Sequence, residues 1–106
     1  MPLFNPIHIG VPTQAIKQGA AWVEGMKIYI TSPDDHPFGY EFVKFEPGNP
    51  FHEKIQNGLH VAGYVDSIDE TIKHADEILL PKTDGGDFFM CFVEKDGVVL
   101  ELLEKK

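Results

Sequence analysis

The chain has 106 residues, of which 42% are hydrophobic and 25% are charged, and its formal net charge is −8 at pH 7. This length suits a single compact domain, and the composition is typical of a folded globular protein. The negative charge, without any lysine cluster, argues against a nucleic-acid partner, and apolar runs of a few residues are far shorter than the ~20 residues of a membrane span.

The only cysteine, Cys91, cannot form an internal disulfide, and no apolar run with a basic flank near the start resembles an export signal. We therefore expect a cytoplasmic protein. Cys91 lies between Met90 and Phe92 in an apolar strand, which favours a core residue over a nucleophile.

The first half predicts a strand at residues 6–12 (PIHIGVP), followed by a short helix that begins at Thr13 and is weakened by Gly19. Two strands follow at residues 26–32 and 40–46, joined by a turn rich in proline, aspartate and glycine. Residues 48–57 then have the prolines and glycines of a connector, with room for one helical turn.

The second half opens with an apolar strand at residues 58–66 (GLHVAGYVD), in which alternation places His60, Ala62 and Tyr64 on one face. Ser67 and Glu70 form the pattern of a capping box, so a helix is predicted to begin there. Its apolar positions are Ile68, Ile72, Ala75 and Leu79, and Pro81 is predicted to end it.

Two further strands, at residues 87–94 and 98–104, are joined by Lys95, Asp96 and Gly97, a sequence typical of a tight hairpin. A short strand near residues 79–82 is also expected. The glycine-containing stretch at residues 83–86 is interpreted as a turn, because no helix follows that would make it a phosphate site. Large apolar side chains, namely Trp22, Phe88, Met90 and Phe92, are expected in the core.

The two halves repeat each other. His8-Ile9-Gly10-Val11 matches His60-Val61-Ala62-Gly63, and Glu41-Phe42-Val43 matches Glu101-Leu102-Leu103. His8 and Glu41 are 33 positions apart, whereas His60 and Glu101 are 41 apart, so the first unit is 8 residues shorter. This difference predicts that the first unit has lost one strand and its turn.

Two imidazoles and two carboxylates in strands are ligands for Zn, Ni, Co, Fe or Mn. If the two units pair about a pseudo-twofold axis, His8 and Glu41 can meet His60 and Glu101. Taken singly, each would more often be a hydrogen-bonded or solvated structural residue, but the matched repeat favours the metal site for all four. His36, His52 and His74 have no such repeat and are expected at the surface.

The segment GLHVAGYVDSIDETIKHADEILLP, followed by FVEKDGVVLELLE, resembles the C-terminal module of the vicinal oxygen chelate superfamily, which includes glyoxalase I and methylmalonyl-CoA epimerase. IHIGV resembles the opening strand of the first module, and YEFVKFEPGNPFHEKI resembles the epimerase segment that links the two. The resemblance implies an α+β fold of two βαβββ modules, the first shortened, that form an open, curved mixed-sheet barrel. The modules would span about residues 4–47 and 58–104, with a connector at 48–57.

By this resemblance, His8, Glu41, His60 and Glu101 fall on the four positions that bind a divalent metal ion, and homodimers are common. It implies a metal-dependent lyase or isomerase that acts on a small oxygen-rich substrate through a metal-stabilised enolate or enediolate. Glu101 is the first candidate for the catalytic base and Glu41 the second. The further catalytic carboxylate that epimerases carry in their first module has no recognisable equivalent, so the glyoxalase-like chemistry is the closer expectation.

Two alternatives come from other classes. One is a non-catalytic, small-molecule-sequestering protein of the same fold, which would have no need for all four ligand positions. The other is a ferredoxin-like β-α-β-β-α-β regulatory domain, which the extra C-terminal hairpin and the repeated His and Glu pairs disfavour.

Overall fold

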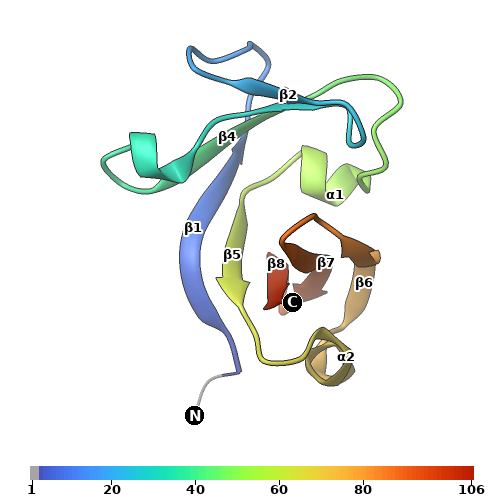
Figure 1. Ribbon diagram of the computed structural model, residues 1–106. Helices are drawn as coiled ribbons and strands as arrows, with labels where there is room; N and C mark the ends of the chain where they lie inside the picture. Colours follow the sequence, from blue (N-terminus) through green and yellow to red (C-terminus); the bar gives the residue numbers. More distant parts are fainter. Residues whose placement is uncertain (1–2) are drawn as a thin grey trace.

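A computed structural model describes residues 3–106, which form one curled eight-stranded sheet with a few short helical turns (Figure 1). In chain order the elements are β1 (Asn5–Pro12), β2 (Ala21–Val23), β3 (Ile28–Ile30), the 3-10 turn η1 (Pro33–Asp35), β4 (Tyr40–Phe45), α1 (Glu53–Gln56), β5 (His60–Tyr64), α2 (Ile68–Thr71), the 3-10 turn η2 (Ile72–His74), β6 (Glu77–Asp84), β7 (Phe88–Lys95) and β8 (Val98–Lys105).

The strand order shows that the molecule is built from two halves of the same topology. The order is β2-β3-β4-β1-β5-β8-β7-β6, so each half places its second, third, fourth and first strands side by side. Within each half the first strand pairs parallel with the fourth, and the two first strands, β1 and β5, pair antiparallel at the centre. The predicted α+β class and the curved mixed sheet are therefore present, and β2 and β6 are its edges.

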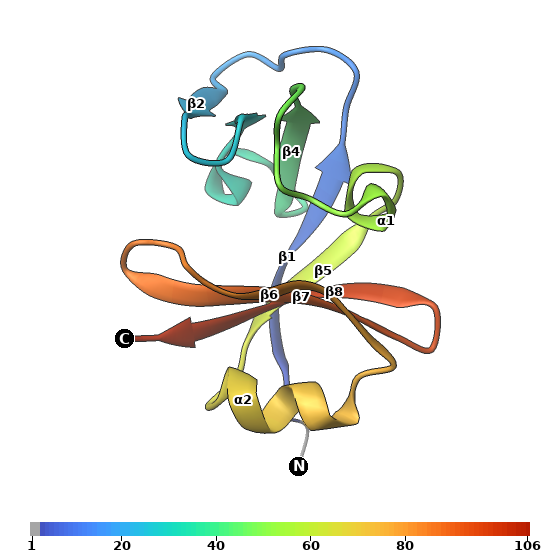
Figure 2. The same ribbon diagram turned by 90° about the vertical axis from the view of Figure 1, so that its right-hand side faces the viewer.

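The core has two parts, one on each side of the second half of the sheet. Alternation along β7 and β8 directs one set of side chains inward, where they pack with residues of α1 and of the first half, and the other set outward. The outward set includes Cys91, Val93 and Leu102, which are covered by Ile68 of α2. Figure 2 shows α2 on one side of β6, β7 and β8, and β2 and β4 of the first half on the other. Covering both faces explains why residues 88–93 of β7 are apolar at every position.

The helix predicted from Thr13 is absent, and this expectation was wrong. Residues 13–20 form a loop, with Gly19 at a φ of +85°, and Ala21–Val23 form β2 instead. Trp22 pairs with Tyr29 of β3 in an antiparallel hairpin, so tertiary pairing of aromatic and β-branched residues prevails over a helix too short to be stable alone.

The shorter first unit has therefore kept all four strands and lost its helix, which corrects the prediction of a missing strand. Trp22 also proves to be exposed on the edge strand rather than in the core, with its indole nitrogen donating to Glu24 at 2.8 Å.

The helix predicted from Ser67 begins as expected, since the Ser67 hydroxyl accepts from the Glu70 backbone N–H. It is shorter than predicted, because η2 ends at His74 and the chain then pairs with β7 as strand β6. Pro81 lies inside this edge strand, where the register with β7 shifts between Leu80 and Thr83, and it does not end the helix. The strand expected near residues 79–82 is thus present and longer. Within residues 3–106, no helix has the length and apolar character to cross a membrane.

Candidate metal centre

The pairing of four central strands explains how residues far apart in the chain reach one place. Gly10 of β1 lies beside both His60 of β5 and Glu41 of β4. Ala62 of β5 lies in the same way beside both His8 of β1 and Glu101 of β8. Paired residues share a face of a sheet, and so do residues two apart on one strand. All four candidate ligands therefore project from one face, the inner face of the curled sheet.

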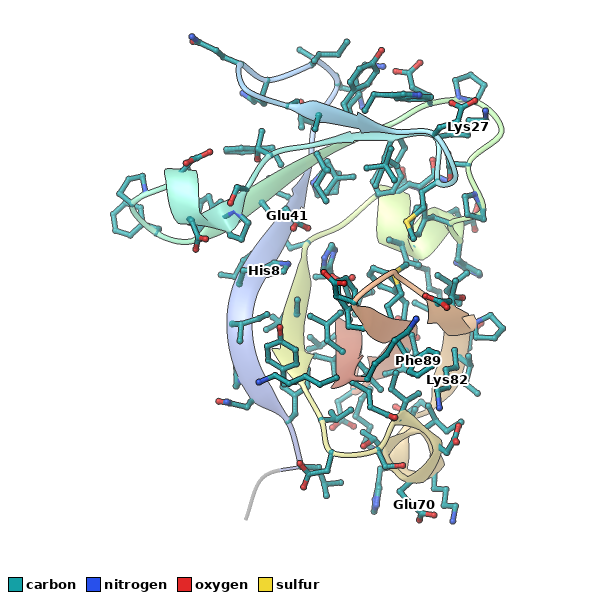
Figure 3. The ribbon with its side chains drawn as sticks, in the orientation of Figure 1. His8, Lys27, Glu41, Glu70, Lys82 and Phe89 are labelled. Carbon is teal, nitrogen blue, oxygen red and sulfur yellow. The ribbon has the colours of Figure 1, made fainter. Side chains whose placement is uncertain are left out.

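The four side chains converge closely and are largely buried. One ligand atom from each of His8, Glu41, His60 and Glu101 can be chosen so that all lie within 4.8 Å of one another. His8 Nε2 lies 3.4 Å from Glu41 Oε1, and His60 Nε2 lies 3.3 Å from Glu101 Oε1. A third contact of 3.8 Å joins His8 Nε2 to Glu101 Oε1. Figure 3 shows His8 projecting from β1 toward the inside of the sheet, with Glu41 nearby on β4.

Two buried nitrogen atoms of the cluster have hydrogen-bonding capacity that the four side chains leave unsatisfied. His8 Nε2 and His60 Nε2 are buried and have no hydrogen-bond partner, although carboxylate oxygens lie 3.3–3.8 Å away. An unpartnered buried polar atom is costly, so native structures rarely contain one without a bound ion or water. Two imidazole nitrogens and two carboxylates are a common donor set for transition metals. The group could therefore hold a metal ion, which would satisfy both nitrogens at once.

The electrostatics of the cluster also favour a cation. Burial lowers the pKa of the His8 imidazole, but the carboxylates of Glu101 and Glu41 outweigh it and raise the pKa from 6.5 to about 9. For Glu101, burial raises the pKa, but the imidazoles of His60 and His8 outweigh that effect and hold it below its ordinary value. The two carboxylates thus stabilise a positive charge within the cluster.

Gly10 and Ala62 make room for the imidazoles. A Cβ atom at Gly10 would lie 1.9–2.5 Å from three atoms of the His60 ring, so that ring occupies the space where a side chain would be. Ala62, at the matching position, is fully buried beside His8. The repeated sequence pattern of histidine, apolar residue and small residue already marked these small positions. Their role follows from the strand register, because each small residue lies beside the histidine of the other half.

The cluster forms the polar end of a cavity of about 220 Å³. Glu41, His60 and Glu101 line it, and the remaining walls come from apolar residues of both halves and of α1. This arrangement places two carboxylates and an imidazole close together in an otherwise apolar lining, where a small molecule can meet them.

Two of the remaining histidines, His36 and His52, make local structural contacts. His36 Nδ1 accepts from the Phe38 backbone N–H, and the His36 ring stacks on Tyr40 at 4.4 Å. His52 Nδ1 accepts from the Lys54 backbone N–H and so caps α1, the one helical turn expected in the connector. His74 is exposed.

Cys91 is 1% exposed and is therefore a core residue, as predicted. It lies in the part of the core that α2 covers. The turn predicted at residues 83–86 begins later than expected, because Thr83 and Asp84 are the last residues of β6 and residues 85–87 connect it to β7. The Asp84 carboxylate accepts from the Gly86 backbone N–H in this turn. Neither feature contributes to the cluster.

Comparison with protein-family models and with curated proteins finds no match to this chain. Among solved structures, the chain is similar to the hypothetical protein BH1468 from Bacillus halodurans, with a TM-score of 0.54 and 22% sequence identity. The likeness covers 97% of this chain and 95% of the other. At this identity it shows a shared fold.

Proposed function

We propose that this chain is a metal-dependent lyase or isomerase of the vicinal oxygen chelate type, acting on a small oxygen-bearing molecule. The observation that carries the proposal is the pair of buried, unpartnered imidazole nitrogens, which lie beside two carboxylates at the end of a cavity. The repeated strand order supports the two-module resemblance, because it places the matched His and Glu residues of both halves at the centre.

His8, Glu41, His60 and Glu101 would hold the metal, and their nitrogen and oxygen donors suit Zn, Ni, Co, Fe or Mn. A divalent ion bound there would polarise a substrate carbonyl and stabilise the negative charge of an enolate or enediolate. Binding requires neutral imidazoles, so a metal would replace the proton that the carboxylates hold on His8.

The protein's own part in the reaction would be proton transfer and exclusion of water. Both Glu41 and Glu101 line the cavity, so either carboxylate is placed to meet a C–H group of a molecule within it. Glu101 is the first candidate for the base, because its carboxylate contacts both imidazoles. Glu41 contacts one and is the second candidate. The apolar walls would limit competition by water.

Metal binding is the first test. Tag-free protein purified without a chelator, or loaded by dialysis with each of the five metals, should retain about one ion per chain by elemental analysis. His60→Ala should lose this ion, whereas His74→Ala should retain it, because His74 is exposed and outside the cluster. Equal metal content in the two variants, or none in the unmodified protein, would remove the basis of the proposal.

Proton transfer is the second test. Metal-loaded protein in D₂O should exchange the C–H protons next to the carbonyl of a simple 2-hydroxy ketone, which NMR can follow. Glu101→Gln should keep the folded circular dichroism spectrum and lose most of the exchange, and Glu41→Gln should lose less. Unchanged exchange in Glu101→Gln with loss in Glu41→Gln would assign the base to Glu41.

The second candidate function is a non-catalytic binding protein of the same fold, which the apolar cavity would also serve. It predicts that small molecules bind equally well after removal of the metal, without any proton exchange. The enzyme proposal predicts that binding and exchange both depend on the ion.

A further inference from the structure

The cavity beside the candidate metal centre has a strongly uneven lining. Its polar groups are Glu41, His60 and Glu101, which belong to the cluster within 4.8 Å and are therefore confined to one point. Apart from Gly85, every other lining residue is apolar. A molecule in this cavity would meet charge and metal at one end and hydrocarbon elsewhere.

The aromatic part of the wall is continuous with the candidate centre. The rings of Phe45 and Phe51 pack edge to face at 5.3 Å between centroids, and Phe51 packs in the same way on Phe92 at 5.7 Å. Phe92 then contacts the His60 ring at 5.1 Å. Edge-to-face aromatic pairs are favourable and restrict one another's rings. The apolar wall is thus preformed, and it would hold an apolar group within reach of the four ligands.

The cavity also lacks the groups that recognise anions. In the described range 3–106, no lysine lines this cavity, and the chain has no arginine among its nine basic residues. Two carboxylates line it instead, and the formal net charge of the whole chain is −8. A phosphate or carboxylate buried here would lose hydration without gaining a cationic partner, apart from the metal itself.

The size of the cavity limits its occupant. Its volume of about 220 Å³ falls below the usual range of about 300–1,000 Å³ for pockets that take drug-sized ligands. The space therefore suits a body of several carbon atoms rather than a cofactor-sized molecule.

We propose that the substrate of this site is a small, uncharged molecule with an oxygen-bearing head and an apolar body. The head reaches the candidate metal centre, and the body lies against the phenylalanine wall. This inference rests on the proposed metal site and narrows it, because it excludes substrates whose body carries a phosphate or carboxylate into the cavity.

A matched series of hydroxamic acids tests the inference, since each member presents the same chelating head to the metal. Isothermal titration of the metal-loaded protein would compare acetohydroxamic acid, hexanohydroxamic acid and the monohydroxamic acid of adipic acid. The second and third have the same chain length, but only the third ends in a carboxylate. Each buried methylene can strengthen binding up to about fourfold, so hexanohydroxamic acid should bind at least about tenfold more tightly than acetohydroxamic acid. The adipic compound should show little of this gain.

The outcomes separate this inference from the proposed function. Failure of the protein to retain metal would remove the proposed function, and this inference with it. Retention of metal with equal affinity for all three acids, or with tightest binding of the adipic compound, would overturn this inference and leave the metal site standing.

A charge-introducing variant gives a second test. Met26 lines the cavity and is half-buried, so the ammonium group of Met26→Lys can lie at its wall. This variant should improve binding of the adipic compound severalfold relative to hexanohydroxamic acid. Ile16→Lys is the control, because Ile16 is exposed and outside the cavity lining, and it should leave the ratio unchanged. An equal change in both variants would indicate a general charge effect and contradict a cavity-bound body.

Discussion

The two halves of the molecule have the same strand order but differ in what covers them. The second half carries α2 and η2 on its outer face, which create a separate outer core with Ile68 and Leu102 fully buried. The first half has a loop at residues 13–20 in the corresponding place, and its apolar residue Ile16 is 54% exposed. Both halves nevertheless deliver one histidine and one glutamate to the same point.

This difference separates two roles of the repeated unit. Ligand placement depends on strand pairing alone, because the residues concerned lie on β1, β4, β5 and β8 at the centre of the sheet. The helix contributes burial of apolar area on the outer face, and that contribution is present in one half. The comparison predicts that outer-face changes alter stability unequally in the two halves, whereas central-strand changes alter the candidate site.

The largest expected effect is on stability. Ile68→Ala should lower the free energy of unfolding by about 2–5 kcal/mol, because it leaves a cavity in the outer core. Ile16→Ala, the same chemical change in the uncovered half, should stay within about 0.5 kcal/mol, as is usual for exposed positions. Urea unfolding followed by circular dichroism measures both. Similar losses would show that the loop at residues 13–20 covers a core of its own.

The next effect concerns the symmetry of the site. Gly10→Ala would bring a methyl group into the His60 ring, so the ring must move. We expect metal affinity to fall about 10–100-fold, the range found when groups that orient a ligand are changed. Gly25→Ala adds the same methyl group where nothing lies within 4 Å, and it should leave affinity unchanged. The half-two counterpart of Gly10 already carries a methyl group, as Ala62. Unchanged affinity in Gly10→Ala would mean that His60 is not held against β1.

The smallest expected effect on stability comes from a variant that compares the outer faces of the two halves. The comparison measures how accessible a thiol is on each face. Cys91 lies opposite Leu102, which follows Glu101, and Thr31 lies beside Phe42, which follows Glu41. Burial, with a smaller contribution from Asp69, raises the pKa of the Cys91 thiol to about 11.

We expect the Thr31→Cys variant to contain two thiols of different reactivity. The new thiol should react readily at pH 8, because no helix in the described part of the chain covers the outer face of the first half, whereas Cys91 should react only in denaturant. The variant should lose about 1 kcal/mol of stability with the hydrogen bond that the Phe42 N–H donates to Thr31. A colorimetric thiol assay with and without denaturant counts both groups. Two slow thiols would indicate that both outer faces are equally covered.

Local signals in the sequence were sufficient to predict where some elements begin and how they are joined. The Ser67 cap marks the start of α2, and the Asp96-Gly97 turn joins β7 and β8 as predicted, with positive φ at both residues. These features depend on hydrogen bonds and dihedral preferences within a few residues, so they are legible without knowledge of the fold.

Errors arose where distant pairing prevailed over local preference. The helical spacing of Ile68, Ile72 and Ala75 continues by coincidence to Leu79, but Leu79 belongs to β6 because the chain there pairs with β7. Residues 21–23 similarly join β3 instead of a helix. In both places strand pairing satisfies backbone groups that a short, isolated helix would satisfy less well.

The sequence by itself determined that His8, Glu41, His60 and Glu101 form a matched set, because a repeat preserves residue type and order along the chain. Only the tertiary structure decided that they meet. The register of three strand pairs fixes which residues face one another: β1 pairs antiparallel with β5, β1 pairs parallel with β4, and β5 pairs parallel with β8. The need for Gly10 beneath the His60 ring likewise exists only after that register is set, since space is shared between strands and not between sequence neighbours.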